Sequence, residues 1–344
     1  MARMKKEDFY QMMTDHMVKA IDNGANSWVK CWKGSDSAEN GYEPRNPMTM
    51  AKGKAYRGSN VFWLWMVQSA MGYDDNRWGT YKSVRDHAIK YAKQQGRTIE
   101  ERPRSNGKGT YLWDVDNDCV FKCGVRKGEK GTKVAYWKMI KIPEVQDDGS
   151  IKEKMIPYFK PSTVFNYEQC DGLPAYEKKE KGHVWNDEID QLSENFFAHQ
   201  NIRLNFGGDR AFYSPSADRI QMPHKENFDG ENQFYSTLYH EMAHSTGHAS
   251  RLNRKGIVGH TRFGSDSYSF EELVAEFTAV FVMGRMGRSE INDDVFMNSA
   301  AYLRGWAKAF RKNPDWVCKA TAKAQAACDF IMKHKELSSL SNVA

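Results

Sequence analysis

Residues 239–244 read Tyr239-His240-Glu241-Met242-Ala243-His244, and this stretch decides the fold class expected for the second half of the chain. It contains the pattern H-E-x-x-H within a segment of helical periodicity. Residues four apart on a helix lie one turn apart on nearly the same face, so His240 and His244 can reach one ion. Glu241 lies on the neighbouring face, where its carboxylate can accept a proton from water. A catalytic Zn²⁺ site pairs such imidazoles with one carboxylate and an open fourth position; a surface helix with two solvated histidines is the alternative.

The third ligand must come from elsewhere in the chain. On an unbroken helix His248 would lie about 12 Å from His240, too far to share an ion with bonds of about 2 Å. Gly247 permits a bend, but the metzincin pattern requires histidine at the position of Ser250. We therefore interpret His248 as a helix-end histidine or as part of a substrate wall.

Residues 270–283 form a second helical segment that is apolar nearly all round, which predicts burial. Glu272 and Glu276 nevertheless lie on one face of it at i, i+4. A buried carboxylate needs a cation or several hydrogen-bond donors. We expect Glu272 to be the third ligand and Glu276 to orient a ligating histidine, and the reverse assignment stays open. Two structural alternatives also remain, a capping box formed by Ser269 with Glu272 and an ion pair of Glu276 with an arginine.

The length of 344 residues suggests two domains or one elaborate domain, and the composition indicates a folded protein. Hydrophobic residues make up 40% and charged residues 27% of the chain. The longest strongly apolar run, 61–67, is too short to cross a bilayer, and the first residues do not resemble a signal peptide. The six cysteines lie far apart and form no C-x-x-C pair; they are Cys31, Cys119, Cys123, Cys170, Cys318 and Cys328. We therefore expect a cytoplasmic location, in the host or recipient bacterial cell, and no membrane partner.

Charge divides unevenly along the chain. Residues 1–165 hold 29 Lys+Arg against 20 Asp+Glu, a balance of +9, and 166–344 hold 21 against 24, a balance of −3. Seven of the ten tryptophans also lie in the first part. A basic, aromatic-rich half predicts a nucleic-acid-binding module, and the alternative is an ordinary solvated surface around an aromatic core.

Periodicity predicts an α+β protein in which helices and strands alternate along both halves. The expected helices are 5–23, 61–71, 79–94, 185–199, 231–247, 268–286, 296–311 and 318–335. The expected strands are 110–115, 118–123, 133–142, 155–166, 201–205, 211–214 and 218–221. Residues 97–109 are a charged excursion, and the Lys-rich stretch 174–182 is the best linker.

Several segments together resemble ArdC-type antirestriction proteins, in the family's order and over nearly the whole chain. Four segments are similar to the family's metallopeptidase domain: Gly208-Asp-Arg-Ala-Phe-Tyr-Ser-Pro-Ser-Ala-Asp-Arg-Ile-Gln-Met-Pro223, His240-Glu-Met-Ala-His-Ser-Thr-Gly-His248, Arg251-Leu-Asn-Arg254 and Glu271-Glu-Leu-Val-Ala-Glu276. The same domain recurs in polyvalent proteins of plasmids and phages. The segments similar to the family's amino-terminal single-stranded-DNA-binding domain are Pro44-Arg-Asn-Pro47, Ala55-Tyr-Arg-Gly-Ser-Asn60, Trp78-Gly-Thr-Tyr81, Val125-Arg-Lys-Gly-Glu-Lys-Gly131, Val134-Ala-Tyr-Trp137 and Val164-Phe-Asn166.

This resemblance implies an α/β domain that binds single-stranded DNA at 1–173, a linker at 174–183 and a zincin-like metallopeptidase domain at 184–340. The gluzincin-like pattern E-x-x-A-acid implies that Glu272, its first glutamate, supplies the third ligand. The chain departs from the family where 97–124 replaces a short connection.

Single-stranded DNA is bound by a basic groove with aromatic stacking platforms, without sequence readout. The residues expected to form it interleave basic and aromatic types: Lys52, Lys54, Tyr56, Arg57, Trp78, Tyr81, Lys82, Arg126, Lys127, Lys130 and Lys133. The turn 127–131 has the alternative interpretation of a simple hairpin loop. Phe62, Trp63 and Trp65 belong to an apolar run and are assigned to the core.

The leading hypothesis is a plasmid or phage protein that binds incoming single-stranded DNA, protects it from restriction and carries a zinc-dependent metallopeptidase-like site. Its ion is Zn²⁺, with Mn²⁺ or Co²⁺ able to use the same ligands. Glu241 is the general base, and Tyr213 is a candidate for steadying the oxyanion. The peptide substrate is a host restriction subunit or another protein. Alternatives are a non-proteolytic DNA-binding protein with a structural metal site and a metal-dependent nuclease, although nucleases usually gather carboxylates around Mg²⁺.

Overall fold

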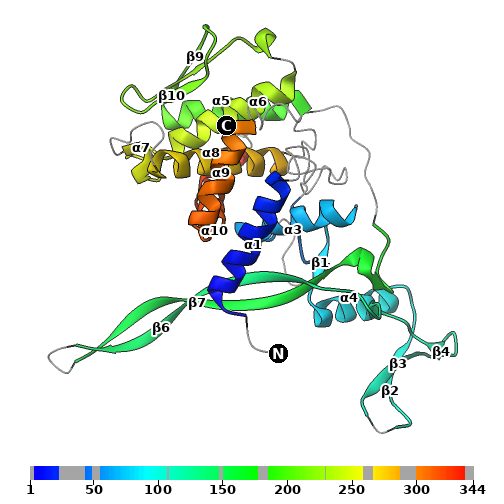
Figure 1. Cartoon of the computed structure of the whole chain (residues 1–344). Helices are drawn as coiled ribbons and strands as arrows, with labels where there is room; N and C mark the ends of the chain where they lie inside the picture. The colour runs from blue at the N-terminus through cyan, green and yellow to red at the C-terminus, as the bar shows by residue number, and fades with distance from the viewer. Residues whose placement is uncertain are drawn as a thin grey trace. The chain divides into compact units, whose positions relative to one another are not determined.

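The fold is given by a computed structural model, which describes residues 4–22, 43–48, 55–106, 108–146, 150–176, 185–228, 230–258, 266–286 and 300–337 (Figure 1). The chain forms two compact units. Unit 1 comprises Met1–Met12, Arg45–Ala55 and Asp75–Tyr176, and unit 2 comprises Met13–Pro44, Tyr56–Asp74 and Glu177–Ala344. Both units contain helices and strands, which confirms the α+β prediction. Tyr56–Asp74 clusters with unit 2 although it precedes the boundary expected at residue 173, and the boundaries 1–173, 174–183 and 184–340 stay a prediction about sequence modules.

Unit 1 is built on an antiparallel sheet with the strand order β1 (Trp78–Gly79), β7 (Ile151–Asn166), β6 (Thr132–Val145). Helix α4 (Tyr81–Gln94) packs against β1 and β7. It begins where the Thr80 side chain accepts a hydrogen bond from the Ser83 N–H at 3.2 Å, which satisfies one of the free amides of the first turn. Val84, Ala88 and Ala92 form its buried stripe.

Part of the charged excursion joins a second sheet of unit 1, which has the order β2 (Ile99–Pro103), β3 (Thr110–Asp114), β4 (Cys119–Val120). Leu112 and Phe121 form a small core with Ala92 of α4. Part of the stretch described from sequence as an excursion is therefore a strand, since β2 pairs with β3 along its whole length. A short pair, β5 (Gly124–Val125) with β8 (Cys170–Asp171), completes the strands described in this unit.

Strands β6 and β7 form a long two-stranded hairpin (Figure 1). They pair without interruption from Thr132 opposite Val164 to Val145 opposite Ile151, beyond the strands expected at 133–142 and 155–166. Fourteen paired residues correspond to about 46 Å of strand. Val134 and Val164 are buried at one end, whereas most of the remaining residues are exposed.

Unit 2 is mainly helical. Its helices are α3 (Ser59–Met71), α5 (Trp185–Gln200), α6 (Glu231–Thr246), α7 (Lys255–Val258), α8 (Asp266–Arg285), α9 (Ala300–Lys312) and α10 (Trp316–Leu337). Helix α8 lies against both α6 and α10, and α10 also packs against α3 and α5. Helix α1 (Lys6–Asp22) is divided between the units, with Met13 as its first residue in unit 2. The packing explains the apolar sequence of α8, which is covered by neighbours on two sides.

Helix α3 supplies aromatic side chains to the core of unit 2. The ring centroids of Phe62 and Phe277 lie 4.9 Å apart, and those of Trp65 and Phe281 lie 6.1 Å apart. Gly284 of α8 makes this approach feasible, because a Cβ at this position would lie 2.8 Å from the Trp65 ring. Phe62, Trp63 and Trp65 are all buried, which confirms their assignment to the core.

A small sheet in unit 2 packs against α6 and has the order β10 (Phe212–Ser214), β11 (Arg219–Met222), β9 (Arg203–Phe206). Strand β11 is antiparallel to β10 and parallel to β9. Ile220 and Met222 of β11 are buried, and β11 packs against α6. Among the described residues, no helix combines the length and the apolar character that a bilayer crossing requires.

Candidate metal centre

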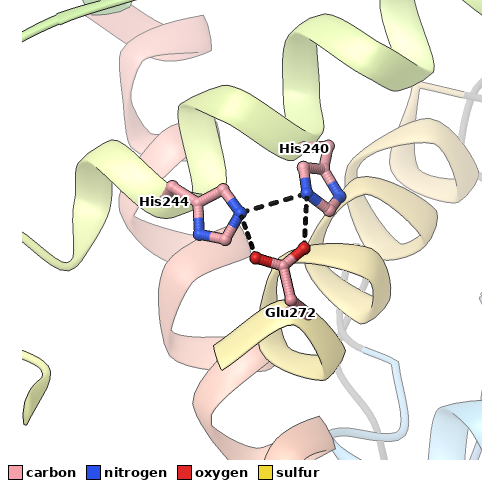
Figure 2. A group of neighbouring side chains, drawn as sticks. All are labelled: His240, His244 and Glu272. Atoms are coloured by element: carbon pink, nitrogen blue, oxygen red, sulfur yellow. Dashed lines mark hydrogen bonds and ion pairs between the residues drawn. The ribbon is translucent and has the colours of Figure 1, made fainter. Parts of the chain in front are cut away.

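Helix α6 brings the two histidines of the H-E-x-x-H pattern to one face. His240 is partly buried and His244 is buried, and their Nε2 atoms lie 3.0 Å apart. Helix α8 places Glu272 opposite them (Figure 2). One oxygen of Glu272 lies 3.5 Å from Nε2 of His240 and the other 3.5 Å from Nε2 of His244.

These separations fit a metal ion. Ligand atoms in a tetrahedral site with bonds of about 2.1 Å lie about 3.4 Å from one another, close to the 3.0 Å and 3.5 Å observed. His240, His244 and Glu272 are the group of potential ligands that the described part of the chain brings within 4.8 Å of one another. Two imidazole nitrogens and a carboxylate that converge in a buried place are stabilised either by a cation or by protons shared between them.

Glu276 meets the other nitrogen of His240. Its Oε1 lies 3.5 Å from Nδ1 of His240, on the side of the ring opposite to Glu272. A carboxylate in this position fixes the tautomer and the orientation of a ligating imidazole. This geometry is compatible with Glu272 as the ligand and Glu276 as the group that orients His240, and the assignment stays a prediction.

The carboxylates give the centre an excess of negative charge. Burial disfavours the charged form of His240, but Glu276, Glu272 and Glu241 outweigh it and raise the pKa of His240 well above its usual value. Glu241 itself is buried on α6 beside the first histidine. A divalent cation at the centre would be attracted by the same carboxylates.

An arginine and a glutamate that the sequence analysis did not single out support His244. Nε of Arg254 donates to both oxygens of Glu271, at 3.0 and 3.1 Å, and the pair is buried. Oε1 of Glu271 lies 3.7 Å from Nδ1 of His244. The Arg254 guanidinium also holds the pKa of Glu271 below its usual value, with the neighbouring His244, against the opposing effect of burial.

The Arg254 guanidinium also forms hydrogen bonds to groups in the last turn of α6. Arg254 donates to the carbonyl oxygen of Ala243 at 2.7 Å and to the Thr246 hydroxyl at 2.6 Å. Carbonyl groups in the last turn of a helix have no partner within the helix, so Arg254 satisfies one of them. Gly247 leaves room for this contact, because a Cβ there would lie 3.0 Å from the guanidinium carbon. The sequence carries no local signal for this role, because the burial of Arg254 is visible only in the folded structure.

Tyr213, expected to steady the oxyanion, has partners of its own. Its hydroxyl donates to Asp218 at 2.7 Å, and Arg251 donates to the same hydroxyl at 3.2 Å. Burial and the Asp218 carboxylate raise the pKa of Tyr213. Arg251 also donates to the carbonyl oxygen of Ser245 at 2.7 Å, so the group fastens the turn of β10 and β11 to the end of α6. The structure gives Tyr213 a positioning role, and a role toward substrate would require its hydroxyl to leave these partners.

His248 lies outside the cluster of ligands. Its Nδ1 is 2.8 Å from the hydroxyl of Ser250, and its backbone belongs to the turn that follows α6. The interpretation of His248 as a helix-end histidine agrees with this position.

Two of the residues expected to bind DNA are buried. Tyr56 is 2% and Trp78 is 0% exposed, so neither ring is accessible for base stacking, and this part of the expectation is corrected. Both rings are part of the core, where burial of their large apolar surface stabilises the fold. Lys52 and Lys54 lie outside the described residues.

The other expected DNA-binding residues are exposed: Arg57, Tyr81, Lys82, Arg126, Lys127, Lys130 and Lys133. Arg57 forms an ion pair with Asp329 in unit 2, and Arg126 pairs with Glu129 at 3.0 Å in unit 1. The turn from Lys127 to Lys130 is fastened by Gln169, which donates to the carbonyl oxygen of Lys130 at 3.0 Å. The basic residues of the turn are therefore held on a defined loop of unit 1.

Two family models match the chain. The model described as the N-terminal domain of anti-restriction factor ArdC matches residues 7–165, and the model described as a zincin-like metallopeptidase matches residues 191–323. The second match contains all three potential ligands, together with Glu241, Arg254 and Glu271.

Relatives match the chain from end to end. DNA primase TraC of Escherichia coli is 32% identical over 96% of this chain, which spans 20% of TraC; a second TraC protein is 30% identical, and the chain spans 28% of it. The chain therefore spans less than a third of the length of these relatives. An uncharacterized protein, y4eC of Sinorhizobium fredii (strain NBRC 101917 / NGR234), is 29% identical over 94% of this chain and 91% of its own length.

Solved structures give the same assignment. The metal-free crystal structure of the antirestriction protein ArdC from plasmid R388 matches 96% of this chain and 98% of its own, with a TM-score of 0.65 and 30% identity. Its Mn(II)-bound structure matches 95% of this chain and 98% of its own, with a TM-score of 0.64 and 30% identity. The chain belongs to the ArdC family of antirestriction proteins and carries the family's N-terminal domain together with a zincin-like metallopeptidase domain.

Proposed function

We propose that this protein protects incoming DNA from host restriction by binding single-stranded DNA, and that it carries a metal-dependent peptidase site in its zincin-like domain. The observation that carries the peptidase proposal is the convergence of His240, His244 and Glu272 at the spacing of a tetrahedral site. Three protein ligands leave one position open for substrate or water, which is typical of catalytic rather than structural zinc.

In this proposal His240, His244 and Glu272 hold one divalent cation, which when bound polarises the scissile peptide carbonyl. Glu241 accepts a proton from the attacking water and delivers it to the leaving amine. Glu276 orients the His240 ring and Glu271 orients the His244 ring, each through the Nδ1 atom of the imidazole. The substrate is a peptide bond of a host restriction subunit or of another protein.

The ion is Zn²⁺ or Mn²⁺. Two imidazoles and one carboxylate favour Zn²⁺ over Mg²⁺, with Co²⁺ able to use the same ligands. The ArdC protein of plasmid R388 has a Mn(II)-bound structure, which supports Mn²⁺ as an alternative for this chain. Metal analysis of the protein purified without added metal distinguishes between them.

Support for single-stranded DNA binding comes from the matched ArdC N-terminal domain and from the +9 balance of residues 1–165. Affinity for oligo-dT should fall steeply as salt rises, because bound lysines and arginines release counterions from the phosphates. Salt-insensitive affinity in a fluorescence titration would contradict a groove that binds the phosphates.

The substitution Glu241→Gln tests whether peptide hydrolysis causes the protection. It removes the proton acceptor and keeps the shape and the three ligands, so we expect unchanged metal content, loss of casein cleavage and loss of protection in vivo. Glu194→Gln, an exposed glutamate of α5, is a matched control that should change none of these. Full protection by Glu241→Gln with unchanged metal content would favour the second candidate, a DNA-binding protein that protects without proteolysis.

A further inference from the structure

The hairpin of β6 and β7 presents an aromatic and basic group that the peptidase site does not use. In its antiparallel register Tyr136 is opposite Lys160, and Lys138 is opposite Tyr158. Opposite residues of two paired strands project from the same face, and so do alternate residues of one strand. The four side chains therefore share one face of the hairpin, and we call them the Tyr–Lys patch.

Both tyrosines of the patch are partly exposed to solvent. Tyr136 is 38% and Tyr158 is 37% exposed, and both lysines are exposed. On the reverse face at the same level, Trp137 is 42% exposed and stacks against Tyr10 of α1 with ring centroids 6.1 Å apart. The patch therefore presents two exposed tyrosines beside two exposed lysines on one face of the hairpin.

The part of the hairpin that carries the Tyr–Lys patch is also locally basic. Residues 132–140 and 156–166 contain Lys133, Lys138 and Lys160 and no acidic residue. The acids of the two paired strands, Glu144 and Glu153, lie toward the other end of the hairpin. The patch therefore lies in a locally cationic surface, which suits an anionic ligand.

The combination of exposed tyrosines and lysines indicates the kind of ligand. Aromatic side chains stack on bases whose faces are free, which single strands offer and a duplex does not. The tyrosines occupy diagonal positions of the register, about 7–8 Å apart, so each ring can take a separate base. We propose that the Tyr–Lys patch binds single-stranded DNA, with Tyr136 and Tyr158 stacking on two bases and Lys138 and Lys160 binding phosphates. This inference rests on the proposed DNA-binding function and assigns it a surface.

Substitution of both tyrosines in the full-length protein tests the stacking. With fluorescein-labelled oligo-dT as the probe, Y136A/Y158A should weaken binding about 25-fold or more, from at least about 1 kcal/mol for each stacked base. Y136F/Y158F keeps both rings and should bind like the wild type. The control M139A/M155A removes two exposed side chains in the same diagonal arrangement on the reverse face and should also bind like the wild type.

Substitution of the lysines gives a second readout, which does not depend on the tyrosine variants. K138Q/K160Q should reduce the slope of log affinity against log salt by about 1.4, since each phosphate contact to a single strand contributes about 0.7. The control K152Q changes a lysine at the acidic end of the hairpin and should leave the slope unchanged. Near-ultraviolet circular dichroism and metal content should match the wild type for every variant.

The outcomes separate the two proposals. Absence of oligo-dT binding by the wild type would overturn both DNA binding and the patch. Binding by the wild type with equal affinity in Y136A/Y158A and an unchanged slope in K138Q/K160Q would overturn the patch alone. A duplex of equal length that competes as well as the single strand would overturn the stacking. If Y136A/Y158A does not fold, the slope of K138Q/K160Q decides.

Discussion

Glu272 and Glu276 are one helical turn apart on α8, yet they meet different nitrogens of the same imidazole. Glu272 lies 3.5 Å from Nε2 of His240, on the side that faces His244, and Glu276 lies 3.5 Å from Nδ1 on the other side. This geometry supports the separate roles that we propose for the two carboxylates, Glu272 as a ligand and Glu276 as the group that orients a ligand.

The substitution Glu276→Gln measures this division of roles. The amide keeps the shape but weakens the interaction with Nδ1 of His240, so the affinity for the metal should fall by about 10–100-fold without loss of the site. Competition with a chromogenic chelator gives the affinity. An unchanged affinity would show that Glu276 does not support His240.

Much of the candidate site can be predicted from the local spacing of residues in the sequence. His240, Glu241 and His244 follow from helical periodicity, and Glu272 and Glu276 follow from charges on a segment that must be buried. The pairing of Arg254 with Glu271 could not be predicted in this way, because it joins residues 17 apart through tertiary structure. The burial of Tyr56 and Trp78 was also missed, since an aromatic side chain beside lysines fits a core and a stacking platform equally well.

At the scale of elements, the buried pair of Arg254 and Glu271 joins the end of α6 to α8. Replacing Glu271 by glutamine leaves a buried guanidinium without its counter-charge, which should lower the free energy of unfolding by about 3–5 kcal/mol. Urea unfolding of the wild type and the variant measures this decrease in the free energy of unfolding. The double variant R254M/E271M, which removes both charges, should recover most of the loss, and a loss below about 0.5 kcal/mol for Glu271→Gln would contradict the role of the pair.

Asp218 fastens the turn of β10 and β11 to Arg251 after α6. Burial acts against the carboxylate, but hydrogen bonds from Arg251 and Tyr213 lower the pKa of Asp218 below 3.8. A lowered native pKa means that the stabilisation is present above pH 3.8 and is lost as the pH falls through the native value. The difference in Tm between the wild type and Asp218→Asn should therefore be constant from pH 7 to 5 and shrink below pH 3.8. A difference that stays constant to pH 2.5 would contradict this account.

Helices and strands with strong periodicity, such as α6 and α8, were predicted within a few residues. The expected strands 133–142 and 155–166 were too short, because the outer part of the hairpin is stabilised by pairing between strands rather than by an alternating apolar pattern. The sheet of β2, β3 and β4 was missed in part, since its small core depends on Ala92 in a preceding helix.

At the scale of the whole molecule, the two proposed activities use different residues. We expect Glu241→Gln to bind oligo-dT like the wild type, because Glu241 lies in the metal centre of unit 2 and the Tyr–Lys patch lies on the hairpin of unit 1. Y136A/Y158A should in turn keep the metal content and casein cleavage of the wild type. Anisotropy and peptidase assays on the same samples test this independence, and loss of both activities in either variant would contradict it.

The central claim is that α6 and α8 together hold one divalent cation. The most direct measurement is the metal content of the purified wild type, His240→Ala and Glu272→Ala, with the surface variant Glu194→Gln as the control. The account predicts one Zn²⁺ or Mn²⁺ per chain in the wild type and the control, and loss of the ion in both ligand variants. A wild type without bound metal, or a Glu272→Ala variant that retains one ion per chain with unchanged affinity, would contradict it.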